Sequence, residues 1–355
     1  MFQQSLGKQL SAVARKMWVM KTPYSYRCTR LNQFCPSFLA DAMTQGAFEH
    51  YLLEGKSCDH SQEHWQYGGI VLDVMCGEFG EWIRGTFRAD RVCIGYFESA
   101  SKAAWINGSS VDDQVLQVYT EKCELACRLY PQTRWALIQV PRSCLEKHFR
   151  EVVGNSARWP SLESGGVSLY SGAEGRVDVG VCFDLCTYLL GKGGDLADQG
   201  VSMLLAAISR AILGGKRQVS KDEGGRGSQA LQKVKLAELY LAAHLAESYS
   251  SHEFARAVGL SERSLELQFK KIFGMSPKKW RQYMGLNIAH RRLGNAGVKP
   301  GVVAEIAASC GFSHPGRFSA VYREVFGELP LFTKNGERRG HSFSQQESIF
   351  KTFMH

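Results

Sequence analysis

The sequence predicts an α+β protein in two parts: an N-terminal β-barrel with helices, followed by an all-α domain with two helix-turn-helix units. Short runs of strand-forming residues, separated by turn residues, fill positions 69–140. Helical periodicity dominates from position 233 onward. Between the two parts, Gly214–Gln229 holds five glycines and many charges, which is typical of a flexible linker. The expected divisions are an N-terminal domain at 1–213, a linker at 214–232, a helical domain at 233–334 and a polar tail at 335–355.

Four apolar or β-branched runs predict strands in the N-terminal part, and clusters of Gly, Asp, Asn and Ser separate them. These runs are Ile70–Met75, Phe79–Phe87, Val115–Thr120 and Trp135–Val140. A helix is expected from Ser143, because Glu146 three residues later completes a capping box. Two more helices are predicted at Val177–Leu190 and Val201–Leu213, since apolar residues recur on one face of each. Such faces are compatible with packing on the barrel and with a dimer interface.

The positive charge of the chain is concentrated in its C-terminal part. Between Arg226 and Arg339 there are 18 Lys and Arg against 9 Asp and Glu, whereas the remainder has 25 against 25. A local positive field suits a polyanion, either nucleic acid or an acidic membrane surface, and a plain solvated surface is the alternative. The eleven cysteines have no framework spacing, and no run reads as a signal peptide or membrane span. We therefore expect a cytoplasmic protein with reduced thiols.

A first helix-turn-helix unit is predicted at 250–273. Ser250 starts a short helix that stops at Gly259, which can adopt the left-handed conformation of a tight turn. Ser261 then caps a second helix, Glu262–Phe273. A helix, a short turn containing glycine and a second helix make the layout of a DNA-reading unit.

The pattern repeats at 302–326. Val302–Ser309 predicts a short helix, Gly311 a turn, and Ser313 the cap of a second helix, His314–Phe326. Pro315 is tolerated there because N–H groups of the first turn have no partner within a helix. Between the two units, a helix at about 277–294 would span ~27 Å, which suits two recognition helices one turn of DNA apart.

The polar faces of the two second helices are predicted to read base edges in the major groove, although an ordinary surface helix is the alternative for each. Arg263 is in the first turn, where an arginine can pair with both acceptors of a guanine. His314 could equally cap, pack or read a base. The candidate base-reading residues are Arg263, Ser264, Glu266, Leu267, Lys270, His314, Gly316, Arg317 and Ala320. The candidate phosphate-contacting residues are Ser261, Lys271, Lys278, Lys279, Arg281, Arg291, Arg292 and Ser313.

These residues together resemble the DNA-binding domain of the AraC/XylS family of bacterial transcription regulators, over roughly Lys233–Lys334. In the first unit the matching positions are Ala255, Ser261, Leu265, Phe269, Gly274, Ser276-Pro277, Trp280, Ala289 and Leu293. In the second unit they are Val303, Glu305-Ile306-Ala307, Gly311-Phe312, Phe318, Phe326-Gly327 and Pro330. The common spacing of so many positions makes the resemblance specific.

The second unit is similar to a branch of the family that includes the ethanolamine-utilisation regulator, through Gly311–Phe318, Tyr322 and Phe326–Glu328. Two departures from the family pattern stand out. Gly285 occupies a position where the family commonly has Arg, which affects one contact of the linking helix. Gly316 and Ala320 provide little side chain, so the second unit is expected to contribute less base readout than the first.

The resemblance implies a DNA-binding transcription regulator, most often an activator, with RNA polymerase as a further partner. It also implies an N-terminal cupin-like barrel that binds an unidentified small-molecule effector and carries contacts of a possible homodimer. It implies no enzymatic activity and no cofactor.

Two other functions compete with this interpretation. An enzyme or repair protein with an AraC-like appendage would need a catalytic or metal site in 1–213, and a basic nucleoid protein would show no sequence preference. Cys123 and Cys127, like Cys182 and Cys186, would lie one turn apart on a helix and offer four sulfurs to zinc. Their spacing differs from that of the zinc-binding repair proteins, and buried structural cysteines are the commoner case, so no metal site is predicted. No catalytic motif is present in the sequence.

Overall fold

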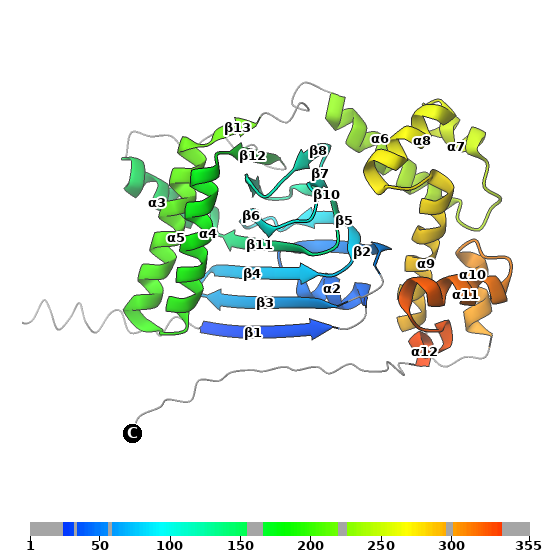
Figure 1. Ribbon diagram of the computed structural model, residues 1–355, viewed down its shortest axis with the longest axis horizontal. Helices are drawn as coiled ribbons and strands as arrows, with labels where there is room; N and C mark the ends of the chain where they lie inside the picture. The colour runs from blue at the N-terminus through cyan, green and yellow to red at the C-terminus, as the bar shows by residue number, and fades with distance from the viewer. Residues whose placement is uncertain are drawn as a thin grey trace, which may run out of the picture.

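The computed structural model of the chain describes residues 24–31, 34–55, 59–154, 166–218, 226–295 and 301–335. Two sheets form its centre, with two long helices, α4 and α5, at one end and the C-terminal helical domain at the other (Figure 1). Each boundary between these layers contains its own group of buried apolar side chains. The fold is therefore a stack of layers, in which the smaller sheet faces the helical domain.

The larger sheet has eight strands in the order β1-β3-β4-β11-β6-β9-β12-β13, and the smaller has five in the order β2-β5-β10-β7-β8. All strand pairs in the described residues are antiparallel. The strands are β1 (Tyr24–Leu31), β2 (Gly46–Glu54), β3 (His60–Tyr67), β4 (Ile70–Gly77), β5 (Gly80–Phe87), β6 (Val92–Ser99), β7 (Ala104–Ile106), β8 (Ser109–Val111), β9 (Val115–Tyr119), β10 (Glu124–Leu129), β11 (Thr133–Val140), β12 (Val167–Ser171) and β13 (Lys216–Gln218).

The expected closed barrel is wrong, because both sheets are open. In the larger sheet β1 and β13 are the two edges, and in the smaller sheet β2 and β8 are the edges. The four predicted strands are present as β4, β5, β9 and β11. Alternating burial predicts a strand and one of its faces, but closure depends on whether the two edge strands meet, which no local pattern determines.

The smaller sheet uses its two faces for different purposes. Phe48, Ile83 and Cys127 point into the space between the sheets and pack with the larger sheet. Their neighbours along the strands, which include Tyr51 and Trp82, belong to the apolar cluster shared with the helical domain. Because successive side chains of a strand alternate between faces, both faces of this sheet are buried.

The helices of the N-terminal part are α2 (Pro36–Ala42), α3 (Arg142–Val153), α4 (Ala173–Leu190) and α5 (Gly194–Gly214). The last three lie close to the positions predicted for them. Gly200 lets α5 approach α4 closely, since an added Cβ there would lie 3.2 Å from the Cα of Cys186. By length and composition α5 is apolar enough to cross a bilayer. Its Leu204, Leu205 and Ile208 are instead buried against the larger sheet, so we assign α5 to the core.

The four cysteines considered as metal ligands lie in two different parts of the molecule. Cys127 is on strand β10 and not on a helix, and it is buried with Cys123 between the sheets. Cys182 and Cys186 lie on α4, on the other side of the larger sheet. Within the described ranges, no group of three or more His, Cys, Asp or Glu side chains is arranged to hold a metal ion.

The segment expected to be a linker, 214–232, is partly structured. Lys216–Gln218 forms β13 and pairs with β12, so the N-terminal sheet continues past the expected boundary. Helix α6 (Arg226–Ala243) begins before the expected end of the linker. The part between them, 219–225, lies outside the described residues, as does the expected polar tail beyond Asn335.

The C-terminal domain consists of helices in the described ranges. They are α6, α7 (Ser251–Ala257), α8 (Glu262–Phe273), α9 (Pro277–Asn295), α10 (Val302–Ser309), α11 (Pro315–Phe326) and α12 (Pro330–Asn335). In Figure 1, α7 and α8 lie near one end of α9, and α10 and α11 near its other end. The predicted linking helix is therefore present, and at ~1.5 Å per residue its 19 residues span ~28 Å.

Candidate nucleic-acid interface

The first helix-turn-helix unit is built by the caps and the turn expected from the sequence. The Ser250 hydroxyl accepts a hydrogen bond from the Glu253 N–H at 3.3 Å and starts α7. The chain reverses at Gly259, whose φ is +65°. The Ser261 hydroxyl accepts from the Ser264 N–H at 3.2 Å and fixes the first residue of α8. Capping satisfies N–H groups that have no partner inside a helix, which makes these boundaries local and predictable.

Helix α8 separates an apolar face from a polar one. Leu265, Phe269 and Ile272 are buried in the core of the unit. Arg263, Leu267 and Lys270 are exposed, as are Ser261 and Lys271 beside them. Ser264 and Glu266 are half-buried, and the Ser264 hydroxyl accepts a hydrogen bond from that of Ser261. The predicted reading face is thus exposed at Arg263, Leu267 and Lys270, which is the condition for entering a groove.

The second unit begins its recognition-like helix one residue later than expected. Helix α11 starts at Pro315, with His314 and not Ser313 as the N-cap, and no side-chain hydrogen bond caps it. Proline fixes φ at a helical value, so it defines the first residue without a serine cap. His314, Gly316, Arg317 and Ala320 are exposed, as is Ser313. Arg317 is the one long side chain among these five exposed residues.

A buried hydrogen-bonded chain joins helix α9 to the second unit. The His290 ring Nδ1 lies 2.5 Å from the Tyr322 hydroxyl of α11, which lies 2.8 Å from the Thr333 hydroxyl of α12. Thr333 in turn donates to Glu328 at 2.5 Å. Since polar groups removed from water must find partners, this chain favours one position of α11 against α9.

Gly285, the departure from the family pattern, lies where α9 meets the turn of the second unit. An added Cβ at Gly285 would lie 2.5 Å from the Cys310 carbonyl oxygen and 3.3 Å from the Phe312 ring. The glycine therefore allows the backbone of the turn to approach α9, which no larger residue permits without a shift. A side chain of arginine size has no room at this position.

Two arginines predicted to contact phosphates have protein partners instead. Arg281 donates to the carbonyl oxygens of Leu245 and Glu247 at 2.6 and 2.5 Å, beyond the end of α6. Burial also lowers its pKa. Arg291 donates to the Glu49 carboxylate of β2 at 2.8 Å. We therefore assign both guanidinium groups a role in stabilising the fold and not in contacting phosphate. Lys278, Lys279 and Arg292 are exposed, although Arg292 also donates to the Ser309 hydroxyl at 2.8 Å.

Glu49 joins the two domains at the edge of the smaller sheet. Arg84 of β5 and Arg291 of α9 both bond to its carboxylate, and both guanidinium groups lie near the Tyr51 ring. Burial alone would raise the pKa of Glu49, but the hydrogen bond from Arg291 and the charge of Arg84 hold it at about 2. The carboxylate is consequently charged at neutral pH and binds α9 to the sheet.

Further contacts of the same face make the domain interface extensive. The Asn287 side chain of α9 accepts from the Leu52 backbone N–H at 3.0 Å, which gives this edge strand a partner. The Trp82 ring packs against Phe273 and Trp280, with ring centres 4.7 and 6.3 Å apart. Aromatic groups of this size contribute most of the energy of a buried interface. The linking helix is therefore fixed to the sheet at several points.

A buried carboxyl lies at the same interface. Glu238 of α6 lies 3.6 Å from the Arg84 guanidinium, where burial raises its pKa to about 7 although Arg84 opposes the shift. The sequence patterns do not single out Glu49, Arg84, Asn287 or Glu238. Each is an ordinary polar residue whose partner lies on a distant segment, so no pattern in the neighbouring residues identifies it.

A family profile for helix-turn-helix domains matches residues 254–335, which contain the end of α7, the helices α8 and α9, and the second unit. Residues 254–335 thus match a helix-turn-helix domain. One solved structure similar to part of this chain is a transcriptional regulator from Chromobacterium violaceum, described as containing an AraC-type DNA-binding domain. It is 31% identical, covers 30% of this chain and 94% of its own, and superposes with a TM-score of 0.28.

The curated relatives match part of the chain. The probable thc operon regulatory protein of Rhodococcus erythropolis is 36% identical over 27% of this chain and 29% of its own. The transcriptional regulator ArgR of Pseudomonas aeruginosa is 31% identical over 45% and 47%. The XylDLEGF operon transcriptional activator 3 of Pseudomonas putida is 32% identical over 32% and 34%. The chain thus spans 29–47% of the length of these relatives, which are named as regulators and not as enzymes.

Proposed function

We propose that this protein is a cytoplasmic, sequence-specific DNA-binding regulator of transcription. The observation that supports this best is the pair of helix-turn-helix units, each with an exposed arginine on its second helix. One matched relative is named as an activator, so we propose activation as the mode of control and RNA polymerase as the protein partner. We further propose that the second unit belongs to the branch that includes the ethanolamine-utilisation regulator, on the residues quoted above.

In this proposal α8 and α11 read bases, and exposed polar residues around them contact phosphates. The base-reading set is led by Arg263, Leu267 and Lys270 on α8, with the flanking Ser264 and Glu266, and by Arg317 on α11. Around Arg317, His314 lies at the start of the helix, and Gly316 and Ala320 let the backbone approach the groove closely. The phosphate-contacting set is Ser261, Lys271, Lys278, Arg292 and Ser313. Lys279 is also exposed, and it lines a cleft between the domains.

Replacing Arg263 by alanine should relax the DNA specificity without disturbing the fold. The side chain is exposed and opposite the packing face, so its removal takes away base contacts and little buried surface. We expect a loss of ~1–3 kcal/mol in binding the preferred operator, concentrated at one base pair. The measurement is operator selection from a random pool, followed by affinity titration at fixed salt. Arg150→Ala, which removes an exposed arginine from α3, is the control for loss of one charge. An unchanged selected motif and affinity for Arg263→Ala would show that α8 does not read DNA in this way.

The N-terminal domain is proposed to respond to a small-molecule effector. Its smaller sheet binds α9 through Glu49 and Asn287, and α9 is the helix that separates the two recognition helices. A ligand that shifts the sheet against α9 would therefore change the distance between α8 and α11 or their mobility. A ligand acts only through a difference in affinity between two states, so we propose that this interface has two arrangements.

We also propose that the protein forms a homodimer through α4. Val177, Val181, Leu185 and Tyr188 recur at steps of four, four and three residues, and 36–61% of each is exposed. Such a stripe lies on one face of a helix and leaves apolar surface in water. In Figure 1, α4 lies at the end of the molecule remote from the helix-turn-helix domain. A twofold axis through α4 would bury the stripe on itself and leave both DNA-binding domains accessible.

Val181→Glu should convert the dimer to a monomer. The substitution places a charge at the centre of the stripe, where dimerisation would remove it from water without a partner. Sedimentation equilibrium at micromolar concentration measures the change. Val152→Glu on α3, another exposed valine, should leave the mass unchanged. A wild-type chain that is monomeric under these conditions would contradict the proposal.

A further inference from the structure

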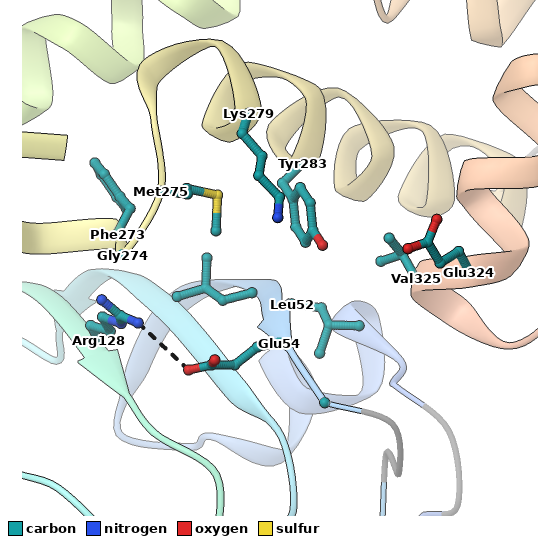
Figure 2. A pocket seen from close by; sticks show the side chains of 12 residues that line it. Leu52, Glu54, Arg128, Phe273, Gly274, Met275, Lys279, Tyr283, Glu324 and Val325 are labelled. Atoms are coloured by element: carbon teal, nitrogen blue, oxygen red, sulfur yellow. Dashed lines mark ion pairs between the residues drawn. The ribbon is translucent and has the colours of Figure 1, made fainter. Parts of the chain in front are cut away.

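A cleft of about 450 Å³ opens between the N-terminal domain and both helix-turn-helix units. Its floor is the end of β2, including Leu52 and Glu54, with Arg128 of β10 beside it. Its roof is the segment that joins α8 to α9, and one side is closed by Glu324 of α11. Figure 2 shows Lys279 and Tyr283 projecting from α9 into this space, with Glu324 beyond Tyr283. A cavity of this size is in the range of small-molecule sites.

Two charged residues of the cleft, Arg128 and Glu54, already have protein partners. The Arg128 guanidinium lies 3.5 Å from the Glu54 carboxylate and donates to the Ile272 carbonyl at the end of α8. It also closely approaches Gly274, whose φ of +73° ends that helix. Arg128 and Glu54 thus form one side of the cleft and join β10 to the first unit.

The two other charges in the cleft, Lys279 and Glu324, have no ion pair with any described residue. Lys279 is in the first turn of α9, and its ammonium lies 5.6 Å from the centre of the Tyr283 ring. The Tyr283 pKa is raised by burial and further by the negative charges of Glu324 and Glu54. The cleft therefore has a cationic corner at the start of α9 and an anionic corner at Glu324, with an aromatic ring between them.

The cleft also has an apolar lining on which the body of a ligand can rest. Leu52, Met275 and Val325 contribute to its walls from the sheet, from the connection between α8 and α9, and from α11. The methionine is unbranched and adapts to ligands of different shape. Opposite charges at the two ends and apolar walls between them match an amphoteric molecule with an apolar substituent.

We infer that this cleft binds a free amino acid or a similar small zwitterion, with its carboxylate at Lys279 and its ammonium at Glu324. The start of α9 adds to the attraction for the carboxylate, because first-turn N–H groups carry a partial positive charge. The inference rests on the proposed regulatory function, for which it supplies the class of effector. The ligand touches the N-terminal domain, α9 and α11 together, so its binding fixes the reading helices against the sheet.

The test is thermal unfolding of the full-length protein with each proteinogenic L-amino acid in turn at millimolar concentration and without DNA. We expect at least one amino acid to raise the melting temperature by about 2 °C or more, since a ligand stabilises the state that binds it. Its methyl ester lacks the negative charge and its N-acetyl derivative lacks the positive charge, so neither should act. Lys279→Met and Glu324→Gln should each abolish the shift. Lys278→Met removes the neighbouring exposed lysine, which does not line the cleft, and should retain it.

The inference is overturned if no amino acid shifts the wild-type protein, or if both cleft variants respond as the wild type does. It is also overturned if the ester or the acetyl derivative acts equally well. DNA is absent from this assay, so the result does not depend on base reading. Conversely, an unchanged DNA motif and affinity for Arg263→Ala would contradict the proposed base reading but would not affect the amino-acid result. The two failures can therefore be distinguished.

Discussion

Leu265→Ala is expected to destabilise the helix-turn-helix domain by ~2–5 kcal/mol and to abolish DNA binding at physiological temperature. Only 1% of Leu265 is exposed, and its side chain lies in the cluster that contains Phe254, Phe269 and Trp280. Removing three carbons from this packed core loses hydrophobic transfer energy and leaves a cavity that neighbours fill only partly. Urea unfolding of the full-length protein, followed by fluorescence, measures the loss.

Leu267→Ala is the matched control, because it is the same substitution two residues further along α8. Leu267 is 59% exposed and belongs to the reading face. Its removal should change stability by less than about 0.5 kcal/mol, as is usual for surface sites. Any effect should appear in DNA affinity, through lost contact with a thymine methyl group. Equal destabilisation by the two variants would mean that the faces of α8 are wrongly assigned.

Gly311→Ala is expected to lower the free energy of unfolding by ~2–5 kcal/mol and to displace the second unit. Gly311 has a φ of +86°, which an L-residue with a Cβ adopts only with strain. An added Cβ would also lie 2.2 Å from the Leu245 carbonyl oxygen, which belongs to the backbone and cannot rotate away. Strain and collision therefore add. The readouts are the melting temperature and binding to an operator with two half-sites.

Gly259→Ala separates these two causes. Gly259 is the turn glycine of the first unit and has a φ of +65°, but nothing lies within 4 Å of its added Cβ. This substitution carries the backbone strain alone, which is about 1–2 kcal/mol. The difference between the two variants measures how tightly the second turn packs on the segment after α6. If Gly259→Ala costs as much as Gly311→Ala, the close packing has no energetic consequence.

Two basic residues of α9 have partners within the protein. Arg281 and Arg291 lie on the helix between the units, and their partners are carbonyl oxygens after α6 and the Glu49 carboxylate. A basic residue on such a helix is available to phosphate only if no nearer acceptor binds it. Here intramolecular acceptors bind both guanidinium groups: Arg281 joins α9 to the segment after α6, and Arg291 joins α9 to the N-terminal sheet.

The sequence by itself determined the local elements of the DNA-binding domain. Ser250 and Ser261 cap helices, Gly259 and Gly311 turn the chain, and Leu265 begins a buried face of period 3.6. Each of these signals acts between residues a few positions apart, so a single sequence contains both partners. The same holds for the four predicted strands and for α4 and α5, because alternation and periodicity are also local.

Only the tertiary structure decided how these elements meet. In it the Asn287 side chain bonds to the β2 backbone, the strands form two open sheets where a barrel was expected, and a cleft lies between Glu54 and Lys279. It also explained Gly285, whose missing side chain makes room for the Cys310 carbonyl. In each case the partners lie far apart in the chain, for example 235 residues for Asn287 and Leu52. Such pairs are selected by the packing of whole layers, and no short-range pattern in the sequence specifies them.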